Sequence, residues 1–516
     1  MKLSRRQWLG GAAGLVGAGL LGSKANGWGD LDDAPIAKGK KPKNIIFCVV
    51  DGMPLSCLTI VDHLRQINEG KRSYWSWLMD QPNVVNGLQD TRSLSSVVTD
   101  SSAASSAWGS GSHIWNGMTN MLPDKTELMT LTKLMAAKGV ACGLVTTATM
   151  THATPSGFAI SCVNRDLEAL IAEKYLDSGV SVFLGGGDRF YSASARKDKR
   201  DLYAEFAAKG FMVIKDRDSM LPAKSDKLLG IFSSGHVPYT VDRNHSLPLQ
   251  RSTPTLSEMT EVALRNLKGK KNGFLLQVEG ARVDHGGHAN DLAAMINDQI
   301  AFEDAVKTCI DFAMKDGETL VIITADHATG GLTLNGAGDE YIESTDGLKR
   351  IANLHASYSG VTPALMANKT TQNAKDVFKD KYELEITDDE AQVVVDALNG
   401  KFALGESIFF RGLTSTLGAV IGNHTKTTFT SANHQSDHVL VSAYGPGSEL
   451  CAGLTQNTEF FGIMCGFKGI THKNPTMTFE QAMPLYEKLQ KELNPQLAEL
   501  QAMYGSHEEC GCVLDR

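Results

Sequence analysis

The sequence contains little proline, no surplus of positive charge and no apolar run long enough to cross a bilayer comfortably. Its 516 residues include only 15 prolines against 50 glycines, which favours a globular chain with many tight turns over a disordered or fibrous one. The formal net charge is −8, from 50 basic and 58 acidic residues, so the chain lacks the basic balance typical of nucleic-acid-binding proteins. We therefore expect a globular protein that binds no nucleic acid.

The first residues of the chain have the features of an export signal. Arg5 and Arg6 come directly before the apolar run 9–22, as in twin-arginine signals, and residues 23–25 (SKA) have the small-x-small pattern of a cleavage site. No cysteine follows the apolar run, which argues against a lipoprotein anchor. We predict a signal peptide over residues 1–28, a periplasmic or secreted location, and no stable membrane insertion after processing. The alternatives are an uncleaved N-terminal anchor and a chance basic start.

Short apolar runs alternate with helical patterns along most of the chain. The helical patterns include residues 291–315, where an apolar face recurs at helical spacing. This alternation predicts an α/β fold, a three-layer α/β/α sandwich around a large, mostly parallel central sheet. Ligands in such folds gather outside the carboxyl ends of the strands. The runs expected to form strands are 44–50, 140–146, 180–184, 274–278, 320–324 and 439–443.

Two later segments depart from this alternation. Residues 330–428 form a polar stretch rich in turn-forming residues, which we interpret as an insertion or cap over the face where the strands end. The C-terminal run 479–504 has an amphipathic helical pattern, and we expect that helix to be broken at Pro495.

The segment VEGARVDHGGHAND holds the densest set of side chains that can bind metal ions. Glu279, Asp284, His285 and His288 fall within ten positions, and the glycines between them allow the backbone to bend around a ligand. An aspartate and a histidine four residues apart supply one oxygen and one nitrogen, a common combination in zinc sites.

Further donors follow other predicted strands. Asp326 and His327 end one strand in the sequence TADH, and Asp51 ends the first strand. His434 and His438, in NHQSDH, precede the last predicted strand. A single histidine at such a place is more often a capping or solvated residue, but several clusters together predict a site for more than one metal ion. The carboxylates would offset the charge of those ions.

A third motif, VTDSSAASSAWGSG, contains a candidate nucleophile. The small residues from Ser101 to Ala107 predict a helix that packs closely against the sheet. A serine at a helix N-terminus faces free backbone N–H groups and the positive end of the helix dipole, which also favour a phosphate group. Without the metal-binding motifs, a simple helix cap with a packing face would be the preferred interpretation.

Taken in order, these motifs resemble the alkaline phosphatase family over most of the chain, from about Lys43 to Pro446. The resemblance rests on VVDG, TDSSAASSAW, THATP with a downstream arginine, VEGARVDHGGH, TADH and H-x9-Y-G-P. It implies an alkaline phosphatase-like catalytic domain over residues 40–516 that hydrolyses small phosphate monoesters through a phosphoserine. Ser101 then corresponds to the phosphorylated serine. Because Asp-Ser-Ser replaces the more usual Asp-Ser-Ala, Ser102 remains a second candidate.

The resemblance also implies a set of ligands for each of three metal ions. Two zinc ions and one magnesium ion are expected, and Arg165 occupies the place of the arginine that grips phosphate. His152 and His285 occupy positions at which family members vary, and there they would tune the metals without binding them directly. The implied ligands are Asp284, His288 and His434 for the first zinc, Asp51, Asp326 and His327 for the second, and Asp51, Thr154 and Glu279 for magnesium.

Other members of the wider superfamily provide the alternatives. Sulfatases need a C/S-x-P-x-R motif that this sequence lacks at the corresponding place, and phosphodiesterases of this type typically use threonine and lack the arginine. A catalytically silent protein that binds phosphate or metal is the alternative outside the enzymes. The resemblance also makes a homodimer a candidate assembly.

Overall fold

The computed structural model describes residues 40–402, 409 and 412–504, with the backbone alone for residues 493–504. The predicted signal peptide, residues 1–28, lies outside this part of the chain. Within it, no helix is both long and apolar enough to cross a membrane.

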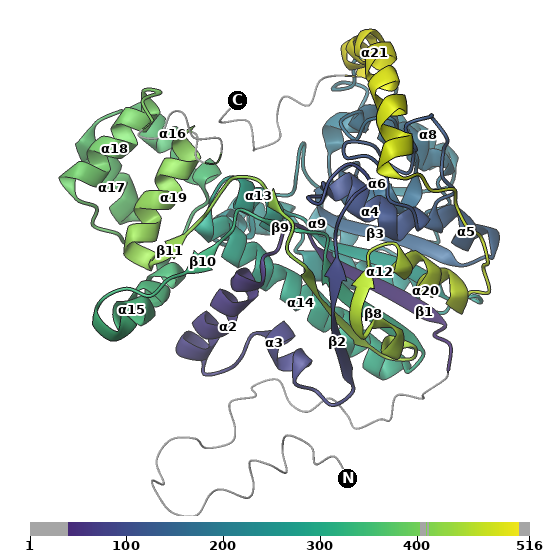
Figure 1. The fold of residues 1–516 in the computed structure, drawn as a ribbon, viewed down its shortest axis with the longest axis horizontal. Helices are drawn as coiled ribbons and strands as arrows, with labels where there is room; N and C mark the ends of the chain where they lie inside the picture. The colour runs from purple at the N-terminus through teal and green to yellow at the C-terminus, as the bar shows by residue number, and fades with distance from the viewer. Residues whose placement is uncertain (1–39, 403–408, 410–411, 505–516) are drawn as a thin grey trace, which may run out of the picture.

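Ten strands of the described chain form one central sheet (Figure 1). Strand β13 is antiparallel to both of its neighbours, and the other pairings are parallel. The predicted mostly parallel sheet is therefore confirmed. In spatial order the strands are β14 (Gly453–Gln456), β2 (Val84–Asp90), β13 (Val439–Tyr444), β8 (Thr319–Ala325), β1 (Asn44–Val50), β7 (Phe274–Gly280), β3 (Ala141–Thr149), β4 (Val182–Gly186), β6 (Leu228–Ile231) and β5 (Met212–Ile214).

Helices cover both faces of the sheet, which completes the predicted three layers. All seven residues of β1 are buried, and its side chains alternate between two hydrophobic cores. The first core contains residues of α2 (Leu55–Glu69), α3 (Tyr74–Met79), α12 (Leu256–Leu267) and α14 (Leu292–Asp316). The second contains residues of α4 (Ser101–Ser110), α5 (Leu131–Ala137), α6 (Ala153–Ala159), α7 (Glu168–Lys174), α8 (Leu202–Ala208) and α20 (Glu459–Phe467). Shorter helices are α9 (Arg217–Met220), α10 (Thr240–Asn244) and α11 (Leu247–Ser252).

One aromatic side chain of β1 fixes the helices that carry part of the site. The ring of Phe47 lies 4.9 Å from that of Trp108 in α4, 5.5 Å from Phe158 in α6 and 6.0 Å from Phe460 in α20. Truncating a buried phenylalanine costs about 3–5 kcal/mol. This contact therefore holds α4 and α6 firmly against the sheet.

The register of the central strands brings their carboxyl ends to one level. Val50, the last residue of β1, pairs with Gly280 of β7 and with Ala325 of β8. Asp51 directly follows Val50, and Asp326 directly follows Ala325, so these two aspartates lie side by side. Glu279 lies at the end of β7, opposite Thr146 of β3. The parallel pairing explains how residues more than 200 positions apart converge.

The segment 330–428 is mostly helical, which corrects the expectation of a turn-rich stretch. Its helices pack on one another, and Figure 1 shows α15 beside α2 and the other helices of the segment above α15 at the left. The polar composition reflects their exposed faces, and Thr387 and Glu390 form a capping box at the start of α18. The role of this lobe as a cap stays a prediction. Its elements are β10 (Thr333–Leu334), α15 (Glu343–Arg350), α16 (Tyr358–Ala367), α17 (Thr371–Tyr382), α18 (Asp388–Leu398), α19 (Gly412–Thr425) and β11 (Thr427–Thr428).

The C-terminal helix α21 runs without interruption from Phe479 to Tyr504. The expected break at Pro495 is therefore wrong. A proline removes one backbone N–H donor and disturbs the turn before it, but neighbouring hydrogen bonds can carry a helix through that position.

Candidate active site

Helix α4 presents two adjacent serine hydroxyls in different directions. Asp100 caps the helix, and its carboxylate accepts a hydrogen bond from the backbone N–H of Ala103 at 2.9 Å. Ser101 Oγ lies 3.2 Å from Nε2 of His327. Ser102 Oγ donates to the Asp100 carboxylate at 2.8 Å. The first hydroxyl thus faces the cluster of metal-binding residues, and the second is held by the helix cap.

The ends of β1 and β8 supply the first group of possible metal ligands. Asp51, Asp326 and His327 are buried, and each offers one ligand atom within 4.8 Å of the others. The Asp326 carboxylate also accepts the backbone N–H of Gly52 at 2.9 Å. Within the described chain, neither carboxylate oxygen of Asp51 accepts a hydrogen bond. A buried carboxylate without donors calls for a cation.

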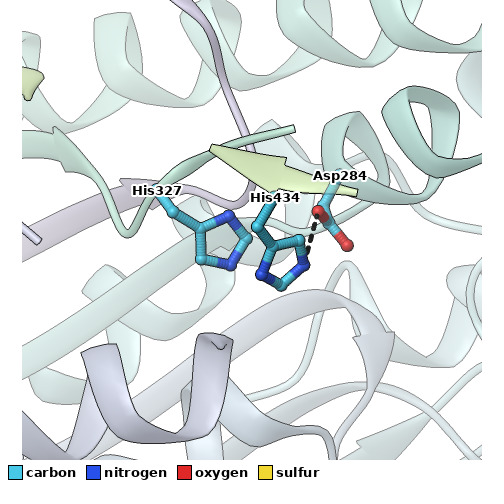
Figure 2. A group of neighbouring side chains, drawn as sticks. All are labelled: Asp284, His327 and His434. Atoms are coloured by element: carbon cyan, nitrogen blue, oxygen red, sulfur yellow. Dashed lines mark ion pairs between the residues drawn. The ribbon is translucent and has the colours of Figure 1, made fainter. Parts of the chain in front are cut away.

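A second group combines helix α13 (Arg282–His288) with the strand pair β12 (His434–Gln435) and β9 (Ala328–Thr329). Asp284 and His288 are one helical turn apart, with Oδ2 and Nε2 separated by 3.4 Å. His434 Nε2 lies 3.7 Å from Asp284 Oδ1 and 2.9 Å from His288 Nε2. Figure 2 shows how His434 lies between Asp284 and His327, with its ring stacked on that of His327 at 3.7 Å.

Two of the three glycines of this motif, Gly286 and Gly287, lie inside α13, so they do not bend the backbone around a ligand as expected. They allow close packing instead. A Cβ atom on Gly286 would lie 2.8 Å from the backbone nitrogen of Met295, and one on Gly287 would lie 3.0 Å from Thr329 Cγ2. The helix itself is what places Asp284 and His288 on one face.

Backbone carbonyls orient both imidazoles of this second group. His288 Nδ1 donates to the carbonyl oxygen of Ala432 at 2.6 Å, and His434 Nδ1 donates to that of Thr99 at 2.8 Å. Because a carbonyl oxygen can only accept, each Nδ1 carries the proton of the neutral ring. The two Nε2 lone pairs then face each other, an arrangement that a metal ion between them would stabilise.

The third group lies around Glu279, between β7, β3 and α6. The Thr146 hydroxyl donates to the Glu279 carboxylate at 2.5 Å, and Thr154 is fully buried at the start of α6. Asp51, Glu279 and His152 each place one ligand atom within 4.8 Å of the others. We expected His152 to support the metal ligands without binding metal, but its position also allows it to act as a ligand of this group.

Burial and mutual repulsion shift the pKa values of these carboxyl groups. Burial raises the pKa of Asp51, and the neighbouring carboxylates raise it further. Burial also raises the pKa of Glu279, to about 8. Burial acts in the same direction on Asp284, but the positive charge that His288 and His434 carry when protonated outweighs it and holds the pKa of Asp284 well below the usual range. The pocket therefore concentrates more negative charge than its side chains neutralise.

Arg165 lies next to the helix cap of α4. Its Nη1 donates to Asp100 Oδ2 at 3.1 Å, and Nη2 lies 3.3 Å from Nε2 of His152. Burial opposes the charge on this guanidinium, but Asp100 outweighs that effect and raises the pKa of Arg165. The structure thus connects the predicted arginine to the residue directly before Ser101.

Three imidazoles gather beside the third group, and one of them was not predicted. The ring of His236 lies 4.4 Å from that of His285 and 5.7 Å from that of His152. The His236 Nδ1 accepts the backbone N–H of Thr149, and Arg282 donates to His285 at 2.6 Å. In the sequence, the signal for His236 was limited to a glycine and a histidine in the loop after a short strand.

His438 does not join the three groups. It lines a cavity of about 400 Å³ beside β9 and β12, together with Leu55, Leu88 and Asp437, and none of the residues of the three groups lines this cavity. The other histidine of the NHQSDH motif, His434, is therefore the one that faces the site.

Comparison with known proteins identifies this arrangement. The sequence model of the alkaline phosphatase family matches residues 42–470. The chain belongs to the alkaline phosphatase family. It is 33% identical to alkaline phosphatase 3 of Bacillus subtilis over 435 residues, which cover 81% of this chain and 87% of that protein. A family member is expected to hold metal ions, and the donor groups described above fit that expectation.

Solved structures of the family share the fold. The crystal structure of Thermus thermophilus alkaline phosphatase matches with a TM-score of 0.82 at 33% identity, covering 91% of this chain and all of that one. A variant of alkaline phosphatase from the Antarctic bacterium TAB5, which has magnesium bound in its M3 site, matches with a TM-score of 0.59 at 25% identity, covering 84% and 99%. This alkaline phosphatase family member is a phosphatase that hydrolyses phosphate monoesters.

Proposed function

We propose that hydrolysis proceeds through a phosphoserine on Ser101, at a site of two zinc ions and one magnesium ion. The observation that carries this proposal is the direction of the Ser101 hydroxyl. This hydroxyl lies 3.2 Å from His327 Nε2, inside the cluster of possible metal ligands, whereas the Ser102 hydroxyl donates a hydrogen bond to Asp100.

The chemistry of each donor group supports the assignment of the metals. Groups that combine imidazole nitrogen with carboxylate oxygen suit zinc, and the oxygens of Glu279 and Thr154 suit magnesium. His152 adds one nitrogen beside the oxygens of this third group. The proposed ligands are Asp284, His288 and His434 for one zinc, Asp51, Asp326 and His327 for the other, and Asp51, Thr154 and Glu279 for magnesium.

Bound metal ions would lower the pKa of the attacking hydroxyl groups and stabilise negative charge on the oxygens around phosphorus. The protein positions the reactants. Ser101 Oγ forms a bond to phosphorus as the bond to the ester oxygen breaks, and the departing alcohol takes up a proton. Water then cleaves the phosphoserine, which frees phosphate and restores the hydroxyl of Ser101. The N-terminus of α4 favours negative charge at this point of the cycle.

Arg165 is proposed to hold the phosphate during both steps. A guanidinium presents its N–H donors in a planar fork that matches two phosphate oxygens. Asp100 holds one side of that fork, through Nη1 at 3.1 Å, and so limits the rotation of a long side chain. An oriented arginine loses less conformational freedom when phosphate binds.

The test compares two adjacent serines in the metal-loaded enzyme. The Ser101→Ala variant is expected to form no phosphoenzyme after acid quenching, measured by intact mass spectrometry, and to lose turnover of nitrophenyl phosphate. Ser102→Ala, which removes only the hydrogen bond to Asp100, is expected to keep the phosphoenzyme. Metal content measured on both variants controls for loss of the site. Loss of the phosphoenzyme in Ser102→Ala alone would contradict the proposal.

The location of the enzyme is proposed from the N-terminal residues. The pair Arg5 and Arg6 before the apolar run supports export by the twin-arginine route to the periplasm or the medium. Replacing both arginines with lysine is expected to leave the protein in the cytoplasmic fraction, and normal export of that variant would contradict the proposed route.

A further inference from the structure

Helix α21 lies beyond the residues that the sequence model of the family matches, which end at 470, yet it packs close to α4, the helix that begins at Ser101. Ala482 and Leu489 of α21 are buried in a small third core that also contains Ala103 of α4. In Figure 1, α21 is the yellow helix at the top, above α4 and α6. The same core contains most of the apolar side chains between Ile114 and Leu128.

Two aromatic rings of α21 stack on a single tryptophan. The ring of Tyr486 lies 4.3 Å from that of Trp115 at an interplanar angle of 18°, and Phe479 lies 5.8 Å away at 15°. Trp115 is 9% exposed, whereas Phe479 is 45% exposed. Ala482 and Leu489 already attach α21 to the third core. The stack therefore adds a second effect, which is to fix the position of the Trp115 ring.

The residues after Trp115 hold both partners of the Asp100–Arg165 pair. The side chain of Asn116 accepts the backbone N–H of Asp100 at 3.2 Å. The backbone N–H of Gly117 donates to Asp100 Oδ2 at 2.9 Å, and its carbonyl accepts the N–H of Arg165 at 2.8 Å. Displacing Trp115 would therefore move the carboxylate that orients the guanidinium and the backbone that carries it.

We propose that α21 positions Arg165 for phosphate binding through the stack on Trp115, with Tyr486 as a positioning residue. This inference rests on the proposed role of Arg165 in holding phosphate. The stack connects through Asn116 and Gly117 to Asp100 and Arg165, so we expect the helix to act mainly on phosphate binding. Its contribution is preorganisation of a flexible side chain.

The first experiment measures the holoenzyme with Tyr486→Ala. We expect KM for nitrophenyl phosphate and the inhibition constant of inorganic phosphate to rise about three- to tenfold, the range that an aromatic pair supplies, without a proportional fall in kcat. Metal content is expected to stay unchanged. Tyr486→Phe keeps the stacked ring and is expected to restore both constants.

A matched control comes from the same helix. Glu492→Ala removes an exposed ion pair with Lys125 at 2.9 Å but leaves the aromatic stack in place, so it is expected to change neither constant. If Tyr486→Ala does not fold, Phe479→Ala removes the outer, half-exposed ring and is expected to raise the same constants by a smaller factor. An unchanged inhibition constant in the folded variant would overturn the proposal.

A second background separates this inference from the role of Arg165. In an Arg165→Ala enzyme, Tyr486→Ala is expected to have no further effect on phosphate inhibition, because both changes act on one interaction. The same fold-change in both backgrounds would overturn the positioning role. If Arg165→Ala alone leaves phosphate inhibition unchanged, the proposed role of Arg165 is wrong, which is a different outcome from failure of the α21 inference.

Discussion

Two groups of buried carboxylates in this protein have opposite surroundings. In the active site, Asp51 is fully buried and accepts no hydrogen bond within the described chain. In the core of α14, Glu303 is equally buried but accepts the backbone N–H of Trp75 at 3.2 Å and the Gln299 amide at 3.3 Å. Burial alone therefore does not distinguish a binding site from a structural position. Between Asp51 and Glu303, the difference lies in the number of hydrogen-bond donors around the carboxylate.

The difference follows from the free energy of burying charge. A carboxylate removed from water is destabilised by several kcal/mol unless donors, a counter-ion or a proton compensate it. Glu303 has donors, and burial still raises its pKa to about 7. Asp51 has other carboxylates and the rings of His327 and His152 nearby, with His327 Nε2 at 3.7 Å, but no hydrogen-bond donor within the described chain. A protein that keeps such a group in its core gains the compensation from metal ions.

The sharpest test of this contrast removes one charge from each group. Asp51→Asn is expected to lower the metal content and to reduce kcat/KM by more than the roughly 10–100-fold seen when an outer partner of a metal ligand is lost. Glu303→Gln, a change of the same size in the core, is expected to keep full metal content and activity. Elemental analysis and turnover of nitrophenyl phosphate measure both. Equal metal loss in the two variants would erase the distinction.

Chelation tests the same contrast through stability. Removing the metals is expected to lower the thermal midpoint of the wild-type enzyme, since an ion at 100 times its Kd contributes ~2.7 kcal/mol to the folded state. In excess chelator at alkaline pH, Asp51→Asn is expected to melt higher than the chelated wild type, because one repelling charge is gone. Calorimetry with and without chelator gives both values. A chelated wild type as stable as the loaded enzyme would contradict the role assigned to the crowded carboxylates.

The sequence predicts the active site where a strand and a ligand are adjacent in the chain. Asp51, Glu279 and Asp326 follow or end buried apolar runs, and parallel strands bring their carboxyl ends to one edge of the sheet. Asp284 and His288 are predicted from their spacing, although the reason for that spacing is a helix and not a loop bent by glycines. Such residues can be predicted because the metal-binding side chains occur where the periodic pattern of a strand or helix places them.

Contacts between distant loops and helices left no such pattern. His236 follows a four-residue strand in a loop without periodicity, so nothing in the sequence connected it with His285. Trp115 and Tyr486 are 371 positions apart in the chain, and stacking sets no spacing rule between them. The helices of the lobe could have been predicted better, since Thr387 and Glu390 have the sequence signature of a capping box.

The smallest expected effect concerns the pH dependence of stability, and it comes from the core carboxylate. Burial raises the pKa of Glu303 to about 7, so the folded protein binds this proton more tightly than the unfolded chain. The stabilisation by that proton is present in full below the unfolded pKa, about 4.3, and is lost as the pH rises through about 7. Glu303→Gln removes this loss. The Gln299 amide oxygen, which accepts no hydrogen bond within the described chain, can receive the new amide.

We therefore expect the unfolding free energy of Glu303→Gln, relative to that of the wild type, to rise by roughly 2 kcal/mol between about pH 5 and about pH 8. Urea denaturation of the metal-loaded proteins at both values measures this difference. Because Glu303 contacts no proposed metal ligand, the metal content must stay constant across the comparison. If the difference in unfolding free energy between the two proteins does not change with pH, the hydrogen bonds from Trp75 and Gln299 suffice to keep Glu303 ionised. The contrast between Glu303 and Asp51 would then come from these hydrogen-bond donors alone.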